Sequence, residues 1–217
     1  AIKARSEYNL RHAPLWLLVA LARRHALKAE TLAKTIQRAD ELTEFLAMYW
    51  KDGKVPISAQ VKKGLALAFQ KFDAFQLARY DRENAIRLCD VLFLVHAKPK
   101  DEEQAGMGKQ LVDGTLPAPD TWEVALSGGA DKKETFERLL VEGNLGYLAL
   151  LRNLRNMRDA GVDKALIEKE LMRGAGRSRV LPFRFVAAAM TNPQWESMIE
   201  KPMLAALEST PHLPGRS

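Results

Sequence analysis

The residues of this sequence whose clustering indicates a chemical role are basic, and one cluster falls in a segment that contains no acids. No acid occurs between Glu170 and Glu196, and that segment contains Arg173, Arg177, Arg179 and Arg184. Guanidinium groups bind phosphate through paired N–H donors, so such a segment can follow a phosphate backbone and release its counterions. A solvated loop without a ligand explains the same composition, and both interpretations stay open.

A second basic group has helical spacing. Arg152, Arg155 and Arg158 recur at every third residue, opposite leucines 148, 151 and 154. This spacing predicts a basic stripe on one amphipathic helix. Pairing with acids one turn away is the ordinary alternative, and only Asp159 is close enough in sequence.

A third basic group falls within residues 62–100. Its members are Lys62, Lys63, Arg79, Arg82, Arg87, His96, Lys98 and Lys100. His96 follows an apolar run and precedes the Lys98-Pro99 step, so we expect it at a helix C-terminus, where its protonated form is favoured. A histidine that serves only the structure is the alternative.

Catalytic and metal-binding patterns are absent from the sequence. The four histidines form no His-Glu-x-x-His motif, and Cys89 is the single cysteine. We interpret Gly106-Met-Gly108 and Gly128-Gly129 as turns, because neither follows a predicted strand or carries a phosphate-loop lysine. The sequence therefore predicts no enzyme, no metal and no cofactor.

Composition fits a folded chain with a basic surface. The 217 residues are 47% hydrophobic and carry a formal net charge of +6, which admits a polyanionic partner. A single cysteine suits a reducing compartment, and no signal-peptide pattern or membrane-length apolar run occurs, so we expect a cytoplasmic protein. The start at Ala1 and the string 210–217 suggest cuts from a longer chain.

Apolar residues recur at three- and four-residue intervals, which predicts an all-α fold. We expect helices at 14–27, 30–49, 59–72, a span capped by Asp81 or Asn84 and ending at His96, and spans starting near Asp101 and Asp131. Others are expected at 121–126, 145–159, 164–173, 183–190 and 194–209, with Pro202 a kink or break in the last. Gly114, Gly143 and Gly161 are predicted helix ends.

About ten short helices with short connections favour a solenoid of stacked helix pairs over a four-helix bundle. No clean repeat period occurs, so the repeats are irregular. We expect the aromatic residues to lie in the core. They are Trp16, Trp50, Phe69, Phe72, Phe75, Trp122 and Trp195.

Four segments in order give the sequence a family resemblance. They are RLCDVLFLVHAKPKD at 87–101, TWEVALS at 121–127, LALLRNL at 148–154 and LPFRF at 181–185. Together they resemble the TROVE module shared by the Ro autoantigen proteins, the telomerase-associated protein and vault-associated particles. The chain is similar to a bacterial- or phage-like member of the Y RNA-binding Ro family.

The resemblance implies a ring, or here a partial ring, of irregular HEAT-like helix pairs with two RNA surfaces. An outer surface would hold a small structured RNA of the Y class. Its candidates are Arg79, Arg82, His96, Lys98, Lys100, Lys62 and Lys63. An inner surface would admit the single-stranded end of a misfolded RNA, with Arg152, Arg155 and Arg184 as candidates.

The chain departs from the Ro pattern at its ends. Ro proteins continue into a von Willebrand A domain with an Asp-x-Ser-x-Ser metal site, and that string does not occur here. We therefore expect a TROVE domain at 1–209 without the family's leading helices, and a linker at 210–217 toward an absent domain.

Two functions from different classes remain after the resemblance. One is a ribonucleoprotein component that binds noncoding RNA in RNA quality control without catalysis. The other is a helical scaffold that docks an exoribonuclease or another protein, with its basic residues merely solvated.

Overall fold

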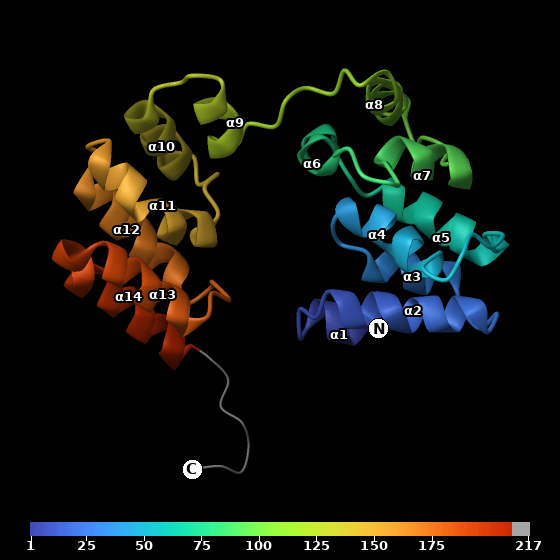
Figure 1. Cartoon of the computed structure of the whole chain (residues 1–217), viewed down its shortest axis with the longest axis horizontal. Helices are drawn as coiled ribbons and strands as arrows, with labels where there is room; N and C mark the ends of the chain where they lie inside the picture. Colours follow the sequence, from blue (N-terminus) through green and yellow to red (C-terminus); the bar gives the residue numbers. More distant parts are fainter. Residues whose placement is uncertain (210–217) are drawn as a thin grey trace, which may run out of the picture. The chain divides into compact units, whose positions relative to one another are not determined.

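The computed structural model describes residues 1–209, and all of its regular elements are helices (Figure 1). The first eight are α1 (Ile2–Ser6), α2 (His12–Arg23), α3 (Ala29–Thr35), α4 (Asp40–Tyr49), α5 (Ala59–Phe69), α6 (Ala74–Tyr80), α7 (Leu88–Val95) and α8 (Glu102–Asp113). The others are α9 (Trp122–Ser127), α10 (Lys132–Val141), α11 (Tyr147–Asp159), α12 (Lys164–Ala175), α13 (Pro182–Thr191), the 3₁₀ turn η1 (Pro193–Trp195) and α14 (Glu196–Glu208). The all-α prediction is confirmed for the described residues.

The chain divides into two compact units. The first is Ala1–Pro119 and holds α1 to α8, and the second begins at Asp120 and holds α9 to α14. Helices two apart pack on one another in both units. These pairs include α3 with α5, α5 with α7, α10 with α12, α11 with α13, and α12 with α14. Within each unit this is the helical-repeat packing that the sequence predicts.

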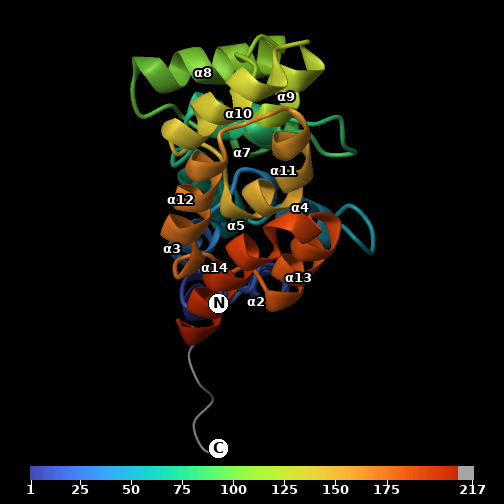
Figure 2. The same ribbon diagram turned by 90° about the vertical axis from the view of Figure 1, so that its left-hand side faces the viewer.

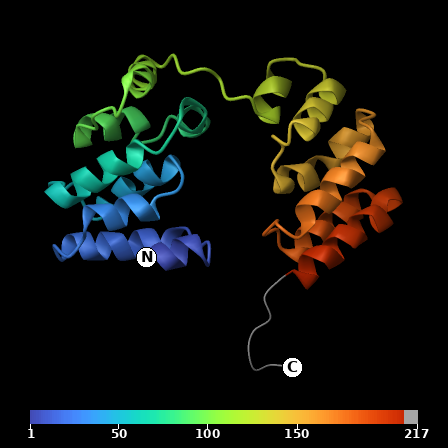
Figure 3. The same ribbon diagram turned by 180° about the vertical axis from the view of Figure 1, so that it is seen from behind.

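The figures show this stacking within each unit. In the second unit, Figure 2 shows α12 and α14 following one another in one column and α11 and α13 in another. Figure 3 shows the layers of the first unit from behind, from α2 through α5 to α7. The ring or partial ring that the TROVE resemblance implies depends on how the units join, and it stays a prediction.

Each unit has its own apolar core. In the first, Leu18, Phe45 and Leu65 are fully buried, and in the second Phe136 and Phe185 are. The expectation that the aromatic residues lie in the core holds for Phe69, Phe72 and Trp195. It is wrong for Trp16 and Phe75, which are 41% and 43% exposed because they point away from the packed helix faces.

Several helix starts and ends lie where the sequence predicts. The Asp101 carboxylate accepts from the Gln104 amide at 2.8 Å, and the Asp131 carboxylate accepts from the Glu134 amide at 2.9 Å. These bonds satisfy first-turn amides that have no partner within the helix. The predicted end glycines adopt positive φ, at 68° for Gly114, 72° for Gly143 and 73° for Gly161.

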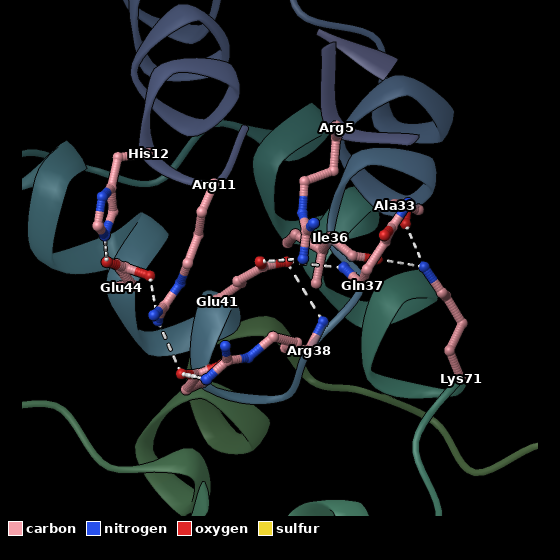
Figure 4. A network of polar contacts seen from close by, with 11 residues as sticks. Arg5, Arg11, His12, Ala33, Ile36, Gln37, Arg38, Glu41, Glu44 and Lys71 are labelled. Atoms are coloured by element: carbon pink, nitrogen blue, oxygen red, sulfur yellow. Dashed lines mark hydrogen bonds and ion pairs between the residues drawn. The ribbon is translucent and has the colours of Figure 1, made fainter. Parts of the chain in front are cut away.

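The predicted single helix at 30–49 is wrong, because the chain is extended at Ile36 with φ −67° and ψ 122°. Two side chains satisfy the backbone groups that this break frees, one from the next helix and one from a distant part of the chain (Figure 4). The Glu41 carboxylate accepts from the amides of residues 37 and 38 at 2.7 and 3.2 Å. The Lys71 ammonium donates to the carbonyls of Ala33 and Ile36. Two helices, α3 and α4, replace one for this reason.

The predicted cap at Asp81 or Asn84 is also wrong. An unpredicted helix, α6, ends just before Asp81, and Asp73 caps it in a reciprocal pair with Gln76. The chain is then non-helical until α7, where the Asp90 carboxylate accepts from the amide that precedes the helix at 2.7 Å. Helix α1 is likewise unpredicted.

Glycine and proline explain three more differences. Gly106 and Gly108 lie within α8, so the turn interpretation is wrong for them, while Gly129 has the φ of 84° that a turn needs. Helix α12 continues past Gly174 to Ala175, and only glycine fits at that position because a Cβ would meet the Tyr147 ring. Helix α14 runs unbroken through the buried Pro202.

Within residues 1–209 no helix has the length and apolarity to cross a membrane.

Candidate nucleic-acid interface

His96 ends α7 in a left-handed conformation, with φ 50° and ψ 49°. Its amide donates to the carbonyls of the last turn, and its side chain is exposed. A histidine tolerates this conformation better than most side chains do. The imidazole therefore belongs to the residue that closes the C-terminal end of α7, and it is open to solvent.

The turn after His96 is held by two glutamines. The Gln70 side-chain amide donates to the Lys98 backbone carbonyl at 2.8 Å. The Lys100 backbone amide donates to the Gln104 side-chain oxygen at 2.9 Å. The Lys98 side chain is exposed and forms no ion pair within residues 1–209, whereas the Lys100 ammonium lies 3.9 Å from Asp101. The backbone is fixed while the Lys98 charge stays available.

Arg79 and Arg82 flank the end of α6. The Arg79 guanidinium lies 5.8 Å from the centre of the Tyr80 ring, and Arg82 is exposed in the following segment. Arg82 and Tyr80 line a cleft of about 800 Å³. The cleft's carboxylates, Asp40 and Glu44, are paired with other arginines, and Arg82 forms no ion pair among the described residues.

The remaining two outer-surface candidates lie on α5. Lys63 is exposed and its ammonium is 3.5 Å from the Glu30 carboxylate. Lys62 is half-buried, with no ion pair among the residues that the structure describes. Both lie seven or eight residues before Gln70, which is roughly 11 Å along a helix axis. The candidates in the first unit thus form separate groups, near Arg82, near Lys98 and at the start of α5.

The basic stripe of α11 divides into two kinds of arginine. Arg152 and Arg155 are exposed, opposite the buried leucines 151 and 154. Arg155 lies 3.7 Å from Asp159, whereas Arg158 binds Asp159 at 2.7 Å and also the Asn192 side chain at 3.2 Å. Arg152 forms no ion pair within residues 1–209. The arginine fixed by packing is therefore Arg158, and Arg152 is free to contact a ligand.

Arg184 lies on α13, which packs against α11. Its guanidinium is 4.8 Å from the centre of the Phe183 ring, and both side chains are exposed. The structure thus brings the three inner-surface candidates onto two adjacent helices of one unit. An exposed aromatic ring beside a guanidinium is a combination that nucleobases can stack on, and the sequence-based search did not single out Phe183.

The acid-free segment also separates into bound and free arginines. Arg173 is paired with the buried Glu170 carboxylate, while Arg177 and Arg179 are exposed with no ion pair in the described residues. Arg177 lines a cavity of about 220 Å³ beside Tyr147, whose hydroxyl donates to a backbone carbonyl at 2.9 Å. Burial raises the pKa of the Tyr147 phenol, so it is a neutral donor.

Within residues 1–209 no three histidine, cysteine, aspartate or glutamate side chains are placed to hold a metal ion. His212 lies outside the described residues, as does the predicted linker at 210–217.

The sequence profile of the TROVE domain matches residues 96–205, which is about half of the chain. The chain belongs to the TROVE domain family. The match begins at His96 and includes Lys98, Arg152 and Arg184, so most of the motif-borne candidates lie inside it. The TROVE resemblance of the four sequence segments is thereby confirmed.

Known relatives agree with this membership over limited lengths. Telomerase protein component 1 of Mus musculus is 37% identical over 78 residues, and that of Rattus norvegicus is 34% identical over 95 residues. These alignments cover 34% and 42% of this chain but 3% of each relative.

A solved structure shares the fold. The crystal structure of the Deinococcus radiodurans RO (RSR) protein superposes with a TM-score of 0.61 at 21% identity. The alignment covers 91% of this chain and 52% of that one, so this TROVE chain spans about half the length of the Deinococcus protein.

Proposed function

We propose that this TROVE chain is an RNA-binding protein that acts without catalysis. The observation that carries the proposal is the set of exposed cations with no carboxylate partner in residues 1–209. They include Arg82, Lys98, Arg152, Arg177, Arg179 and Arg184. A cation that forms no internal ion pair can exchange its counterion for a phosphate, which is the main source of affinity for nucleic acid.

The finer part of the proposal concerns two kinds of RNA. The first unit, through His96, Lys98, Arg79 and Arg82, would bind a small structured RNA of the Y class. The second unit, through Arg152, Arg155 and Arg184, would bind the single-stranded end of a misfolded RNA. Support comes from the TROVE resemblance and from the exposure of these side chains on two separate units. RNA quality control in the cytoplasm, with an exoribonuclease as partner, is the setting that the resemblance suggests.

The test is a reciprocal experiment with two double variants. Replacing His96 and Lys98 with alanine should weaken the binding of a blunt stem-loop RNA by about tenfold and leave the binding of a single-stranded 3′ tail unchanged. Replacing Arg152 and Arg184 should do the reverse. Fluorescence anisotropy with labelled RNAs measures both affinities, and circular dichroism should show unchanged helicity, because all four side chains are exposed.

The Arg158→Ala variant is the matched control for the second pair. Arg158 lies on the same helix but is bound to Asp159 and Asn192. Its loss should lower the melting temperature and change RNA affinity little. Equal weakening of both RNAs by both double variants would mean general electrostatic attraction and would contradict two distinct surfaces.

A further inference from the structure

A cavity in the first unit lies beside the Lys98 turn, and its walls are mostly apolar. It is bounded by the end of α5 and by α6, α7 and α8, and its volume is about 330 Å³. Phe69, Phe72 and Leu77 line it and are at most 4% exposed, while Phe93 at its edge is 58% exposed. This volume lies at the lower end of the range for small-molecule sites, which are also lined mainly by apolar side chains.

Hydrogen bonds fix the walls of this cavity. The buried Gln104 side chain donates to the Gln70 carbonyl at 3.0 Å, and the Gln70 side chain donates to the Lys98 carbonyl at 2.8 Å. These bonds join α8 and the Lys98 turn to the end of α5. The cavity is therefore formed before any ligand arrives, which lowers the entropic cost of binding.

Charge at the cavity has one sign. Lys98 and Lys109 line it, both are exposed, and neither forms an ion pair within residues 1–209. No aspartate or glutamate is among the described residues that line it. An apolar interior with two uncompensated cations matches a ligand that has an apolar body and one negative charge.

We propose that this cavity binds a small amphipathic carboxylate, with its hydrocarbon part against Phe69 and Phe72 and its carboxylate toward Lys98 and Lys109. A small molecule fits better than a peptide, because the buried phenylalanines lie in a cavity of limited volume. Lys98 is shared with the RNA proposal, but the apolar walls and Lys109 are not RNA candidates, so the inference does not depend on RNA binding.

Decanoate is the probe, and decyltrimethylammonium, with the same chain length and the opposite charge, is its control. Calorimetric titration of the full chain, with both probes below their micelle concentrations, should show saturable one-site binding of decanoate only. Amide chemical shifts should change around Lys98, Lys109 and Gln104. Equal binding of the two probes would overturn the proposal.

Two glycines of α8 supply matched variants. A Cβ at Gly108 would lie 3.8 Å from the Leu92 side chain, within the cavity wall, so Gly108→Leu should fill the cavity without moving the backbone. A Cβ at Gly106 would meet nothing within 4 Å, and this residue does not line the cavity. Both variants remove a glycine from the same helix, so they differ mainly in whether the new side chain enters the cavity.

Gly108→Leu should weaken decanoate binding by about tenfold or more, whereas Gly106→Leu should leave the affinity for decanoate unchanged. Lys109→Glu should weaken decanoate binding by about fivefold and strengthen binding of the cationic probe, because the charge of this side chain at the cavity rim is reversed. Stem-loop RNA affinity of Gly108→Leu should equal that of the unmodified chain. No binding of decanoate to the unmodified chain, or equal binding to Gly108→Leu and Gly106→Leu, would overturn the proposal and leave the RNA proposal untouched.

Discussion

Replacing Glu41 with alanine is expected to lower the free energy of unfolding by about 3–5 kcal/mol, because it leaves the buried Arg5 guanidinium without its anion. Glu41 is fully buried, and its carboxylate accepts from the buried Arg5 guanidinium at 2.6 Å (Figure 4). It also accepts from the amides of residues 37 and 38 and attracts the Lys71 ammonium. The single substitution therefore removes the acceptor of several donors at the junction of α3 and α4.

Thermal and denaturant unfolding followed by circular dichroism measure this loss, which corresponds to a fall of about 10 °C in melting temperature. Glu44→Ala is the control, since Glu44 also binds an arginine but is 23% exposed in its side chain. Glu44→Ala should lower the free energy of unfolding by about 1 kcal/mol or less. Equal losses for the two variants would show that the Glu41 network does not hold the junction.

Gly64→Val is expected to destabilise the first unit by about 3 kcal/mol, because α5 packs on α3 with no space for a side chain at this residue. A Cβ at Gly64 would lie 2.9 Å from the Ala29 carbonyl oxygen and 2.9 Å from the Leu32 Cβ. Neither atom can move unless α3 shifts. Such a shift would disturb Leu32 and Ile36, which are fully buried in the core of this unit.

Gly106→Val is the matched control, because it makes the same change in a helix at a residue with open space around it. It should change the free energy of unfolding by less than about 1 kcal/mol. Denaturant titration measures both variants. A Gly64→Val chain as stable as the control would mean that the close contact of α3 and α5 is not required.

Local chemistry was enough to predict most helices. Caps at Asp101 and Asp131, and end glycines such as Gly114, act on backbone groups within a few residues, so the sequence alone indicates them. Apolar periodicity likewise placed Leu151 and Leu154 opposite the arginines of α11, and both are buried, although Leu148 is exposed. The fold class follows from these signals alone.

Long-range contacts decided the features that the sequence could not show. The break at Ile36 depends on Lys71, which lies 35 residues further along the chain, and on Glu41, which is itself paired with Arg5, 36 residues away. Gly64 resembles any other helix glycine until α3 is placed against it. Tertiary packing overrides local helix preference at both places.

The same limit applies to the candidate interface. Arg152 and Arg158 have equivalent spacing on one helix, yet Arg158 reaches Asn192, 34 residues away, while Arg152 stays exposed. Lys63 and Lys98 both belong to one basic group in the sequence, but Lys63 is paired with Glu30 on another helix. Which cations are free can be known only once the helices are packed.

Salt dependence of RNA binding tests the central claim most directly. A labelled stem-loop RNA is titrated with the full chain at several concentrations between about 50 and about 200 mM salt. The account predicts that log affinity falls linearly with log salt, with a slope of about 3 or more, because several free cations displace counterions from phosphates. Affinity no tighter than about micromolar and unchanged by salt would contradict the claim and favour a protein-docking scaffold whose basic residues are merely solvated.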